Sequence, residues 1–544
     1  MTELETLFAV AASATWPDPP DGWADPWLVG AVHEQAATST DRKARGAWYT
    51  PRSVVVGLVR LATADGVAPA RVVDPTCGGG AFLLAGLDRL VELGIDPADA
   101  VARVGGIDVD PVAVQASEWS IRLWLGSQLL RRGDAGPIDD RQDHPVDIRH
   151  GDSLVSWPAD WSGPILVAGN PPFASPLKRG AVPGVAAERR EERSELLGPY
   201  ADIAAVHLLN AVEQAGAGST VVLVQPQSIL SSRDTENLRA DLDERAPLTG
   251  LWAAREALFD AGVRACAPVL QVGRARRSEP VVVVAAGPDV TVGGERPAQG
   301  WGDLAADALG APSLPPLVGR LGDLVRATAG FRDEHYGLVS VCREAEAGEA
   351  GGDAIETARL VTVGSVDPLS LAWGRQPMRF GGHDWDRPIV TRTGLSPRVG
   401  RWFDAQLGPK VLLATQSKLL EPVVDRTGDL MPATPLIAIH ADPADLDHVA
   451  AVLLAPPVVL WAWRRWFGTA LTVDGVKLAA RQVEELPLPT HQGRWDEAAA
   501  LIAATDSPDR DGLVPQVGAI MTEAYGAGTE VMDWWLNRLN GVRR

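Results

Sequence analysis

The segment PILVAGNPPFASPLKR (164–179) ends an apolar run in Asn-Pro-Pro-Phe, residue types that together could hold a flat ring bearing an amino group. Proline has no N–H and fixes φ, so Pro171 and Pro172 stiffen the segment. The carboxamide oxygen of Asn170 and the carbonyl of Pro171 are two acceptors, which suit the two N–H donors of a planar amino group. The ring of Phe173 offers a face for stacking. Taken alone, the motif could also be a stiff turn after a buried strand.

Acidic residues end three other short apolar runs, at Asp74, Asp108 and Asp152. Asp74 begins the run DPTCGGG (74–80), in which glycines allow a tight turn and the following helix offers free N–H groups. A carboxylate there would repel a pyrophosphate and suits a cation such as an ammonium or a sulfonium. Asp108 could accept both ribose hydroxyls of a nucleoside, and Asp152 could accept an adenine amino group. Each could instead only begin a helix or cap a turn.

Short β-branched runs alternate with amphipathic stretches from Arg71 to Val272, which predicts a doubly wound α/β sheet. The expected strands are 71–74, 104–109, 147–150, 165–169, 219–224 and 268–272, and helices are expected at 81–94 and 203–216. Open α/β sheets bind ligands at the carboxyl ends of their strands. The three acidic residues and Asn170 are therefore expected at one edge of the sheet.

A second region begins near Pro312 and consists of irregular segments rich in Trp, Arg, Pro and Gly, up to ELPLP (485–489). Within it, the Gly/Ala/Glu-rich piece 343–356 is expected to be an exposed loop. The tail beyond ELPLP has a helical pattern. The predicted division is a helical segment at 1–45, the α/β domain at 46–311, a mixed α+β domain at 312–490 and a helical segment at 491–544.

Length and composition limit the class of protein. A chain of 544 residues is too long for one core, and its net charge of −20 argues against a protein that coats nucleic acid non-specifically. A local basic groove can nevertheless lie in an acidic body. Three cysteines without a CxxC pair predict neither a disulfide framework nor a metal site, and suit a reducing cytoplasm. The amino terminus lacks a basic leader, and the longest apolar run (451–463) is too short to cross a membrane.

The order and spacing of these motifs resemble those of the bacterial DNA adenine-N6 methyltransferases, in the class whose cofactor motif precedes the catalytic motif and whose target-recognition domain comes last. The run GAWYTP (46–51) resembles the GxxYTP motif that precedes the sheet in that family, and 221–230 and 258–272 resemble its later strand motifs more loosely. The resemblance covers residues 45–275. It implies a seven-stranded, Rossmann-like methyltransferase sheet in 46–311 and target recognition by 312–490.

The resemblance also implies a cofactor, S-adenosylmethionine, and a role for each motif. Asp74 would hold its methionine end, Asp108 its ribose and Asp152 its adenine amino group, with Val109 against the adenine face. The implied cofactor-binding residues are Thr50, Pro51, Asp74, Thr76, Cys77, Gly78, Asp108, Val109, Asp152 and Ser153. The implied catalytic residues are Asn170, Pro171, Pro172 and Phe173.

The implied substrate is an adenine in double-stranded DNA, which must leave the base stack to be reached. Phe173 would stack on the flipped base with Phe259 as a second wall, and Lys178 and Arg179 would hold the DNA backbone. The acidity of the chain is unusual for such an enzyme, so basic residues are expected to gather on one face. These are Arg42, Lys43, Arg45, Lys178, Arg179, Arg464, Arg465, Lys477 and Arg481.

Several alternatives stay open at this stage. Related motifs serve methylation of cytosine N4, of ribosomal RNA and of protein glutamine, and a methyltransferase-like chain could act as a non-catalytic scaffold subunit. The long carboxyl region favours sequence-specific DNA, and the cytosine-N4 group usually has Ser in place of Asn170. A separately encoded restriction endonuclease is an open partner. The role could be restriction-modification, phage defence or gene regulation.

Overall fold

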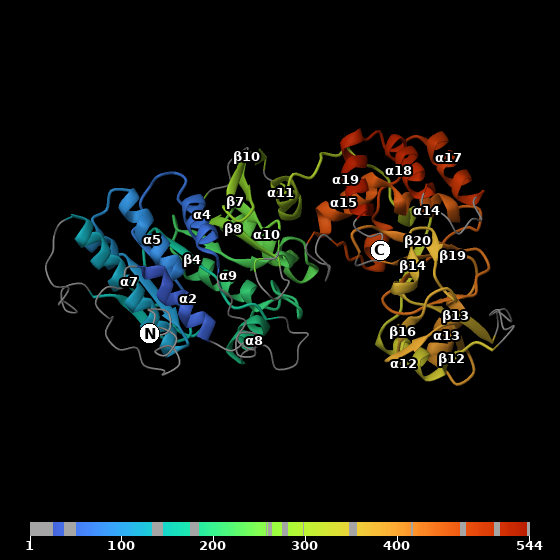
Figure 1. Ribbon diagram of the computed structural model, residues 1–544, viewed down its shortest axis with the longest axis horizontal. Coiled ribbons are helices and arrows are strands. Elements are labelled where there is room, and N and C mark those ends of the chain that lie inside the picture. Colours follow the sequence, from blue (N-terminus) through green and yellow to red (C-terminus); the bar gives the residue numbers. More distant parts are fainter. Residues whose placement is uncertain are drawn as a thin grey trace. The chain divides into compact units, whose positions relative to one another are not determined.

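The computed structural model describes two compact units, which divide between Leu309 and Gly310 (Figure 1). The described residues are 25–36, 50–132, 145–174, 184–256, 258, 264–274, 281–297, 299–346, 356–414, 417–467, 475–504 and 512–540. Each unit is described by itself below.

The first unit is built on a ten-stranded sheet with the order β10-β9-β7-β8-β5-β4-β1-β2-β3, and β6 pairs with β8. Strands β1 to β5 pair in parallel, whereas β8 runs antiparallel to both β5 and β7. The strands are β1 Arg71–Asp74, β2 Val104–Asp108, β3 Asp147–His150, β4 Ile165–Gly169, β5 Thr220–Leu223, β6 Gln225–Pro226, β7 Leu248–Ala253, β8 Ala265–Gln271, β9 Val281–Ala286 and β10 Thr291–Pro297.

All six strands expected from the sequence are present, but the predicted count of seven is wrong. The sheet continues past β7 into β9 and β10. Strand β10 (TVGGERP) carries two glycines, a terminal proline and mostly exposed side chains, so it has neither the composition nor the alternation of a buried strand. It is held by antiparallel pairing with β9, the preceding strand of the same hairpin, and its own residues do not indicate this pairing.

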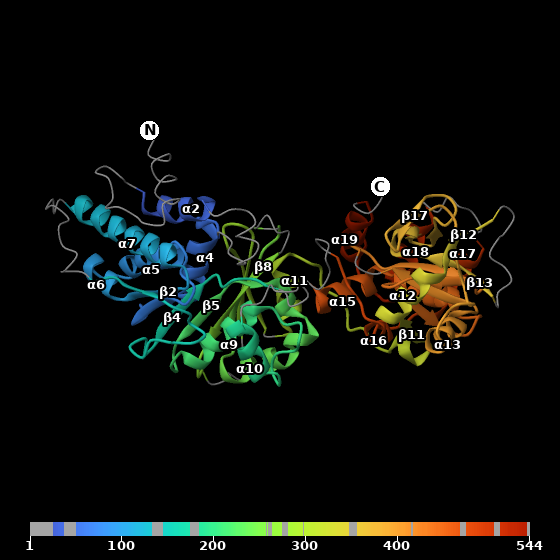
Figure 2. The ribbon, with the colours of Figure 1, turned by 90° about the horizontal axis from the view of Figure 1, so that it is seen from below.

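Helices cover both faces of this sheet: α2, α4, α5 and α7 lie on one side, and α9 and α10 on the other (Figure 2). The helices of the first unit are α2 Pro26–Ala36, α4 Arg52–Ala62, α5 Ala81–Glu92, α6 Pro97–Ala102, α7 Pro111–Arg132, α8 Gly184–Glu192, α9 Ile203–Gln214, α10 Glu236–Arg245 and α11 Trp301–Ala308. Of the helical segment expected at 1–45, the structure describes only α2 and Asp25 before it, and α2 packs against α7.

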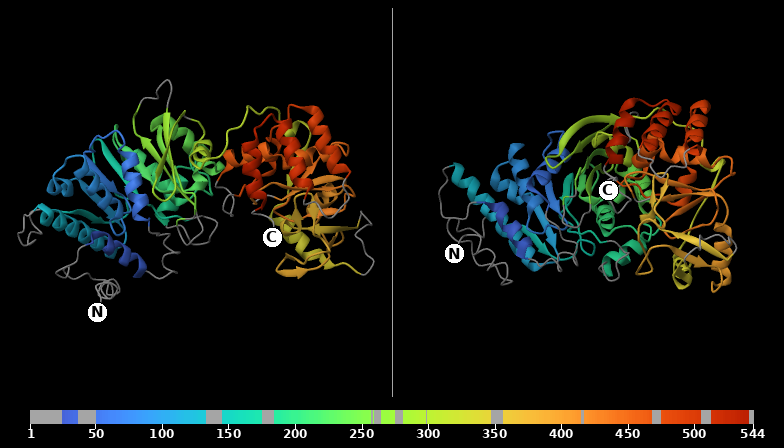
Figure 3. Two further views of the ribbon diagram at one scale, coloured as in Figure 1. Left: turned by 45° about the horizontal axis from the view of Figure 1, so that its top comes forward. Right: turned by 45° about the vertical axis from the view of Figure 1, so that its right-hand side comes forward.

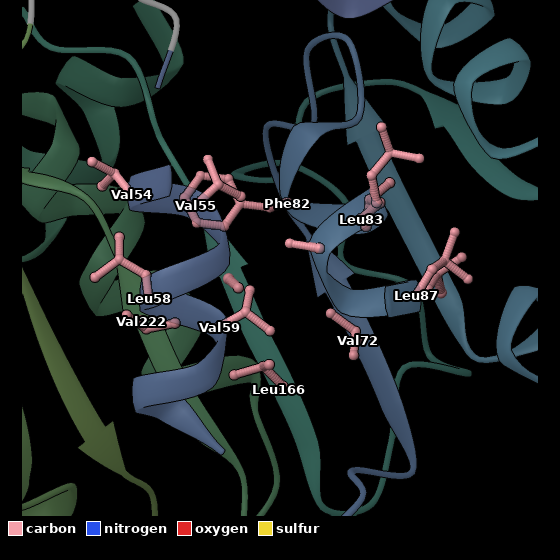
Figure 4. Packing of buried hydrophobic residues seen from close by; sticks show 14 of the residues in the cluster. Val54, Val55, Leu58, Val59, Val72, Phe82, Leu83, Leu87, Leu166 and Val222 are labelled. Carbon is pink, nitrogen blue, oxygen red and sulfur yellow. The ribbon is translucent and has the colours of Figure 1, made fainter. Parts of the chain in front are cut away.

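The core of the first unit joins α4 and α5 to the parallel strands (Figure 4). The apolar residues of α4 recur at the spacing that places them on one side of a helix. Packed side chains include Val54, Val55, Leu58 and Val59 of α4, Phe82, Leu83 and Leu87 of α5, and Val72, Leu166 and Val222 of β1, β4 and β5. Because this packing fixes β1 and β4 side by side, the residues at their carboxyl ends have fixed positions.

The second unit contains two four-stranded sheets, β11-β22-β19-β20 and β12-β18-β13-β21, and two short hairpins. The strands are β11 Arg326–Ala329, β12 Cys342–Glu344, β13 Thr357–Val361, β14 Val366–Asp367, β15 Ser370–Leu371, β16 Met378–Phe380, β17 His383–Trp385, β18 Pro388–Thr391, β19 Lys410–Ala414, β20 Glu421–Asp425, β21 Leu430–Pro432 and β22 Ile437–His440. The helices are α12 Arg332–Val341, α13 Pro397–Gln406, α14 Leu446–Leu454, α15 Pro456–Trp466, α16 Ala480–Glu484, α17 Gln492–Ala503, α18 Leu513–Ala524 and α19 Thr529–Asn540.

The helices after residue 490 gather with α14 and α15 (Figure 3). Tyr525, at the carboxyl end of α18, donates its hydroxyl to the Pro487 carbonyl at 2.8 Å, and Trp495 of α17 donates its indole N–H to the His448 carbonyl at 2.9 Å. The tail therefore packs into the same compact unit as the strands. Of the loop expected at 343–356, residues 347–355 lie outside the described part.

A cluster of buried charges links the two sheets of the second unit. Lys410, at the start of β19, is fully buried and donates to Asp425 at the end of β20 at 2.5 Å. Arg359 of β13 donates two hydrogen bonds, of 2.6 and 2.7 Å, to the Asp429 carboxylate. Asp425 also accepts the backbone N–H of Gly428. The turn between β20 and β21 is thus held by matched charges.

Among the described residues, no single helix is long and apolar enough to span a membrane. Only when α14 and α15, which meet at 60°, are taken together do they reach the length and apolar composition of a membrane-spanning segment.

Candidate active site

Four polar residues lie at the carboxyl ends of neighbouring parallel strands. Asp74 ends β1, Asp108 ends β2, Asp152 follows β3 by two residues and Asn170 follows β4 directly. The sheet order β3-β2-β1-β4 places these ends along one edge, as the strand pattern predicts. Their roles in binding and catalysis remain predictions.

Asp74 is a buried carboxyl group, with 2% of its surface exposed. It accepts the backbone N–H of Thr76 at 2.9 Å, and no lysine or arginine pairs with it in the described part of the chain. Burial, with a smaller contribution from the nearby Asp108, raises the pKa of Asp74 to about 8 despite that hydrogen bond. A Cβ at position 169 of β4 would collide with the Asp74 carboxylate, and the glycine there avoids this collision. Strand β4 can therefore approach this carboxyl group closely.

The glycine turn after β1 is tied to the end of β2. Gly78 donates its N–H to Asp108 Oδ2 at 2.8 Å, and it adopts a φ of +49°, which favours glycine. The side where its Cβ would stand is open. Gly79 meets the backbone of Gly30 in α2 so closely that a Cβ on either residue would collide. One side of the turn thus packs against α2, and the other side is open.

The second strand ends in an acidic residue followed by an exposed apolar one. Asp108 Oδ1 accepts the N–H of Asp110 at 2.8 Å, while Val109 is 63% exposed. The carbonyl of Val109 lies 3.1 Å from His150 Nε2. Cys77 is buried and packs beneath the end of β2, where burial raises the pKa of its thiol. Cys77 therefore has a packing role here, whereas Val109 offers an apolar surface beside a carboxylate.

The turn after β3 presents polar groups from Asp152 and Ser153. Asp152 Oδ1 accepts the N–H of Leu154 at 2.9 Å. Ser153 Oγ is buried and makes no hydrogen bond to any described residue. His207 of α9 lies near Asp152, and burial lowers the pKa of its imidazole to about 4 although the Asp152 charge opposes this shift. A buried hydroxyl without a hydrogen-bond partner among the described residues is commonly satisfied by an ordered water or a polar ligand.

The catalytic segment predicted from the sequence is held at its first residue by Thr50. Asn170 Nδ2 donates to Thr50 Oγ1 at 3.0 Å, and Thr50 is buried just before α4. This contact uses the amide nitrogen and so orients the carboxamide, whose other heavy atom is the acceptor Oδ1. Phe173 is partly buried and packs against the core. Thr50 therefore contacts Asn170, a contact that the sequence did not predict.

Two further residues that sequence reasoning missed hold these segments from α9. Asp202 accepts the N–H of Ala174 at 3.1 Å, and Asn210 donates to the Ser153 carbonyl at 3.2 Å. Asp202 stands directly before the expected helix, where an aspartate is a typical amino-terminal cap. That signal locates the helix start, but nothing in the local sequence indicates the contact with residue 174.

Several predicted site residues lie outside the described part of the chain: 46–49, Arg42, Lys43, Arg45, Lys178, Arg179 and Phe259. Of the basic residues in the second unit, Arg464 donates to the Pro312 carbonyl at 3.3 Å and Arg465 lies over the Trp461 ring at 4.3 Å. Arg481 is exposed and sits 4.0 Å from Glu485. Arg464 and Arg465 thus make structural contacts within their own unit.

Residues 28–117 match the model of the N-6 DNA methylase family. This segment of the chain is therefore similar to that family. The matched segment includes Thr50, Asp74 and Asp108 and ends within α7, before the catalytic segment at Asn170. Over 136 residues the chain is 31% identical to the type I restriction enzyme MjaIX methylase subunit of Methanocaldococcus jannaschii. That alignment covers 25% of this chain and 20% of the relative.

Two solved structures have a fold similar to that of most of the chain. The type IIL restriction-modification enzyme MmeI in complex with DNA is similar over 96% of this chain and 80% of its own, with a TM-score of 0.60 and 11% identity. The DrdV–DNA complex is similar over 88% of this chain and 59% of its own, with a TM-score of 0.50 and 12% identity. At these identities the likeness is one of fold.

Proposed function

We propose that this chain is a DNA methyltransferase that transfers a methyl group from S-adenosylmethionine to N6 of adenine in double-stranded DNA. The observation that carries the proposal is the position of Asn170-Pro171-Pro172-Phe173, which follows β4 at the edge where β1 presents the buried Asp74. The relation to the N-6 DNA methylases supports it. The curated relative is matched over only a fifth of its length, so the activity of the whole chain is a proposal.

The residues at this edge fit S-adenosylmethionine. Asp74 is a buried carboxyl without a cationic partner among the described residues, and would accept the ammonium of the methionine end. Asp108 would accept ribose hydroxyls, and the exposed Val109 would cover the adenine face. The buried Ser153 hydroxyl and Asp152 offer a donor and an acceptor for the adenine edge. When bound, S-adenosylmethionine supplies an electrophilic methyl group.

Asn170 and Pro171 would prepare the target nitrogen. The lone pair of an adenine amino group is delocalised into the ring, which makes the nitrogen a poor nucleophile. If Asn170 Oδ1 and the Pro171 carbonyl accept its two N–H groups, a pyramidal nitrogen is favoured, with its lone pair directed at the methyl group. Fixed acceptors of this kind act mainly by alignment and electrostatic stabilisation. Thr50 would keep the carboxamide in the required orientation.

We assign the stacking of the flipped base to Phe173 and the reading of the DNA sequence to the second unit. The partial burial of Phe173 against the core would hold its ring at a fixed angle, and stacking on an aromatic ring stabilises an unstacked base. Two similar folds, MmeI and DrdV, were solved with DNA, which supports DNA as the partner. A separately encoded restriction endonuclease is the protein partner we propose, because the curated relative is a restriction-enzyme methylase subunit.

The proposal is tested by incubating the purified chain and its Asn170→Ala variant with methyl-labelled S-adenosylmethionine and separate DNA, RNA and protein substrates. Asn237→Ala is the matched control, because Asn237 is an exposed residue of α10 in the same unit and donates to the Glu195 carbonyl. We expect label on DNA, recovered as N6-methyladenine after digestion, from the wild type and the control but not from Asn170→Ala. Label on RNA or protein alone, or N4-methylcytosine in the digest, contradicts the proposal.

A further inference from the structure

The start of α9 holds the residue that follows the catalytic segment. Asp202 Oδ1 accepts two backbone N–H groups, from Ala204 at 3.0 Å and from Ala174 at 3.1 Å. The first is the ordinary cap of α9. The second reaches back 28 residues. The carbonyl of Ala174 accepts the N–H of Ile203 at 3.4 Å, so both backbone groups of Ala174 are bound to the start of α9.

This attachment fixes Phe173 from its carboxyl side. On its amino side, Pro171 and Pro172 have restricted φ angles, and Asn170 is held by Thr50. The contacts to Ala174 anchor the backbone directly after Phe173, so the segment is held at both of its ends. The direction of the Phe173 ring therefore depends on Asp202, which the proposed mechanism does not place in contact with the reacting groups.

Asn210, two turns further along α9, holds the turn assigned to the cofactor's adenine. Its Nδ2 donates to the Ser153 carbonyl at 3.2 Å. Eight residues of helix place Asp202 and Asn210 about 12 Å apart along the axis. The helix between them is almost entirely buried, and Gln225, which follows β5, donates to the Ala204 carbonyl at 3.0 Å. Helix α9 is thus a rigid connection between two contacts.

We propose that α9 positions the two halves of the site separately, with Asp202 setting the catalytic segment and Asn210 setting the turn at Ser153. Both are positioning residues, and the inference rests on the proposed function of the site. Loss of Asp202 disturbs the stacking of the target base and leaves cofactor binding intact. Loss of Asn210 weakens cofactor binding and leaves the transfer step intact once the cofactor is bound.

The test compares the full-length variants Asp202→Ala, Asp202→Asn and Asn210→Ala with Asn237→Ala. Affinity for S-adenosylhomocysteine is measured by calorimetry without DNA, and methyl transfer is measured in a single turnover at saturating S-adenosylmethionine. For Asp202→Ala we expect transfer to fall about tenfold with affinity within about twofold, since both hydrogen bonds that Asp202 accepts are lost and the one from Ala174 holds the catalytic segment. Asp202→Asn should recover most of the rate, because an amide oxygen can accept the same two N–H groups. For Asn210→Ala we expect the reverse: affinity for S-adenosylhomocysteine falls, and methyl transfer at saturating S-adenosylmethionine is retained.

Hydrogen exchange of the same proteins gives a readout that needs no activity. Asp202→Ala should speed exchange in the peptide that contains residues 170–174, and Asn210→Ala should do so in the peptide that contains residues 152–156. If the wild type binds S-adenosylhomocysteine but methylates no DNA, the proposed function fails while the exchange result still decides the inference. Equal losses of affinity in both alanine variants, or unchanged exchange at both peptides, would overturn the inference.

Discussion

Both units bury carboxyl groups, but the pair at the turn between β20 and β21 of the second unit is matched by cations, whereas Asp74 of the first unit pairs with no described lysine or arginine. In the second unit, Lys410 and Arg359 pair with Asp425 and Asp429. Burial alone would raise the pKa of Asp429, but its hydrogen bonds from Arg359 and Thr427 bring that pKa below its usual value. In the first unit, Asp74 has no such cation among the described residues, and its pKa rises to about 8. The matched charges hold a turn, whereas the unmatched carboxyl is the one that we propose binds a positive ligand.

The largest expected effect comes from breaking the matched pair with Lys410→Met. This change leaves Asp425 buried without its partner, which should lower the free energy of unfolding by about 3–5 kcal/mol. Thermal and denaturant unfolding measure the loss. The exposed Arg481→Met is the control, expected to change stability by less than about 0.5 kcal/mol. If Lys410→Met is as stable as the control, the charge cluster is not structural.

The unmatched carboxyl should respond in the opposite way. Asp74→Asn replaces a carboxyl that is protonated below about pH 8 in the free protein by a neutral amide of similar shape, so we expect the folded chain to keep its stability. Its affinity for S-adenosylmethionine should fall about a hundredfold, since a charge-assisted contact with the ammonium is lost. Calorimetric titration measures the affinity, with Asp65→Asn on the surface of the same unit as control. A large loss of stability with unchanged affinity would show that Asp74 is a structural residue.

The raised pKa of Asp74 also predicts how binding depends on pH. Without a ligand the carboxyl is protonated below about pH 8, whereas a bound cation favours the charged form. Binding therefore releases a proton, and affinity should rise with pH from 5.5 to 7, by up to about tenfold per pH unit. Titrations in buffers of different ionisation enthalpy measure the released proton. Asp74→Asn should show neither the slope nor the proton.

The smallest effect should come from Thr50, which accepts a hydrogen bond from Asn170 at the same edge of the sheet as Asp74. Thr50→Val removes the hydroxyl that accepts from Asn170 Nδ2. We expect methyl transfer to fall about threefold to tenfold, in line with one neutral hydrogen bond. Thr50→Ser should retain the rate. Equal rates in all three proteins would mean that the carboxamide is oriented without Thr50.

The positions of the site residues could be predicted because these strands end where an apolar run gives way to polar residues. Asp74, Asp108 and Asn170 each follow a short buried run, and parallel strands bring such ends to one edge. What could not be predicted are pairings between residues far apart in the chain. The contacts of Asp202 with Ala174 and of Thr50 with Asn170 depend on how α9 and α4 pack. Strand β10 was missed for a different reason: it pairs with its neighbour β9 in a hairpin, but its glycines, proline and exposed side chains lack the pattern of a strand.

The close meeting of Gly30 and Gly79 has a practical consequence for fragments of this protein. A fragment that starts at Thr50 would keep every strand of the first unit and each acidic residue of the edge. It would lack α2. The backbone of α2 at Gly30 packs against Gly79 of the glycine turn so closely that neither glycine can carry a side chain. Such a fragment should fold its sheet and yet leave that turn open to solvent on both sides.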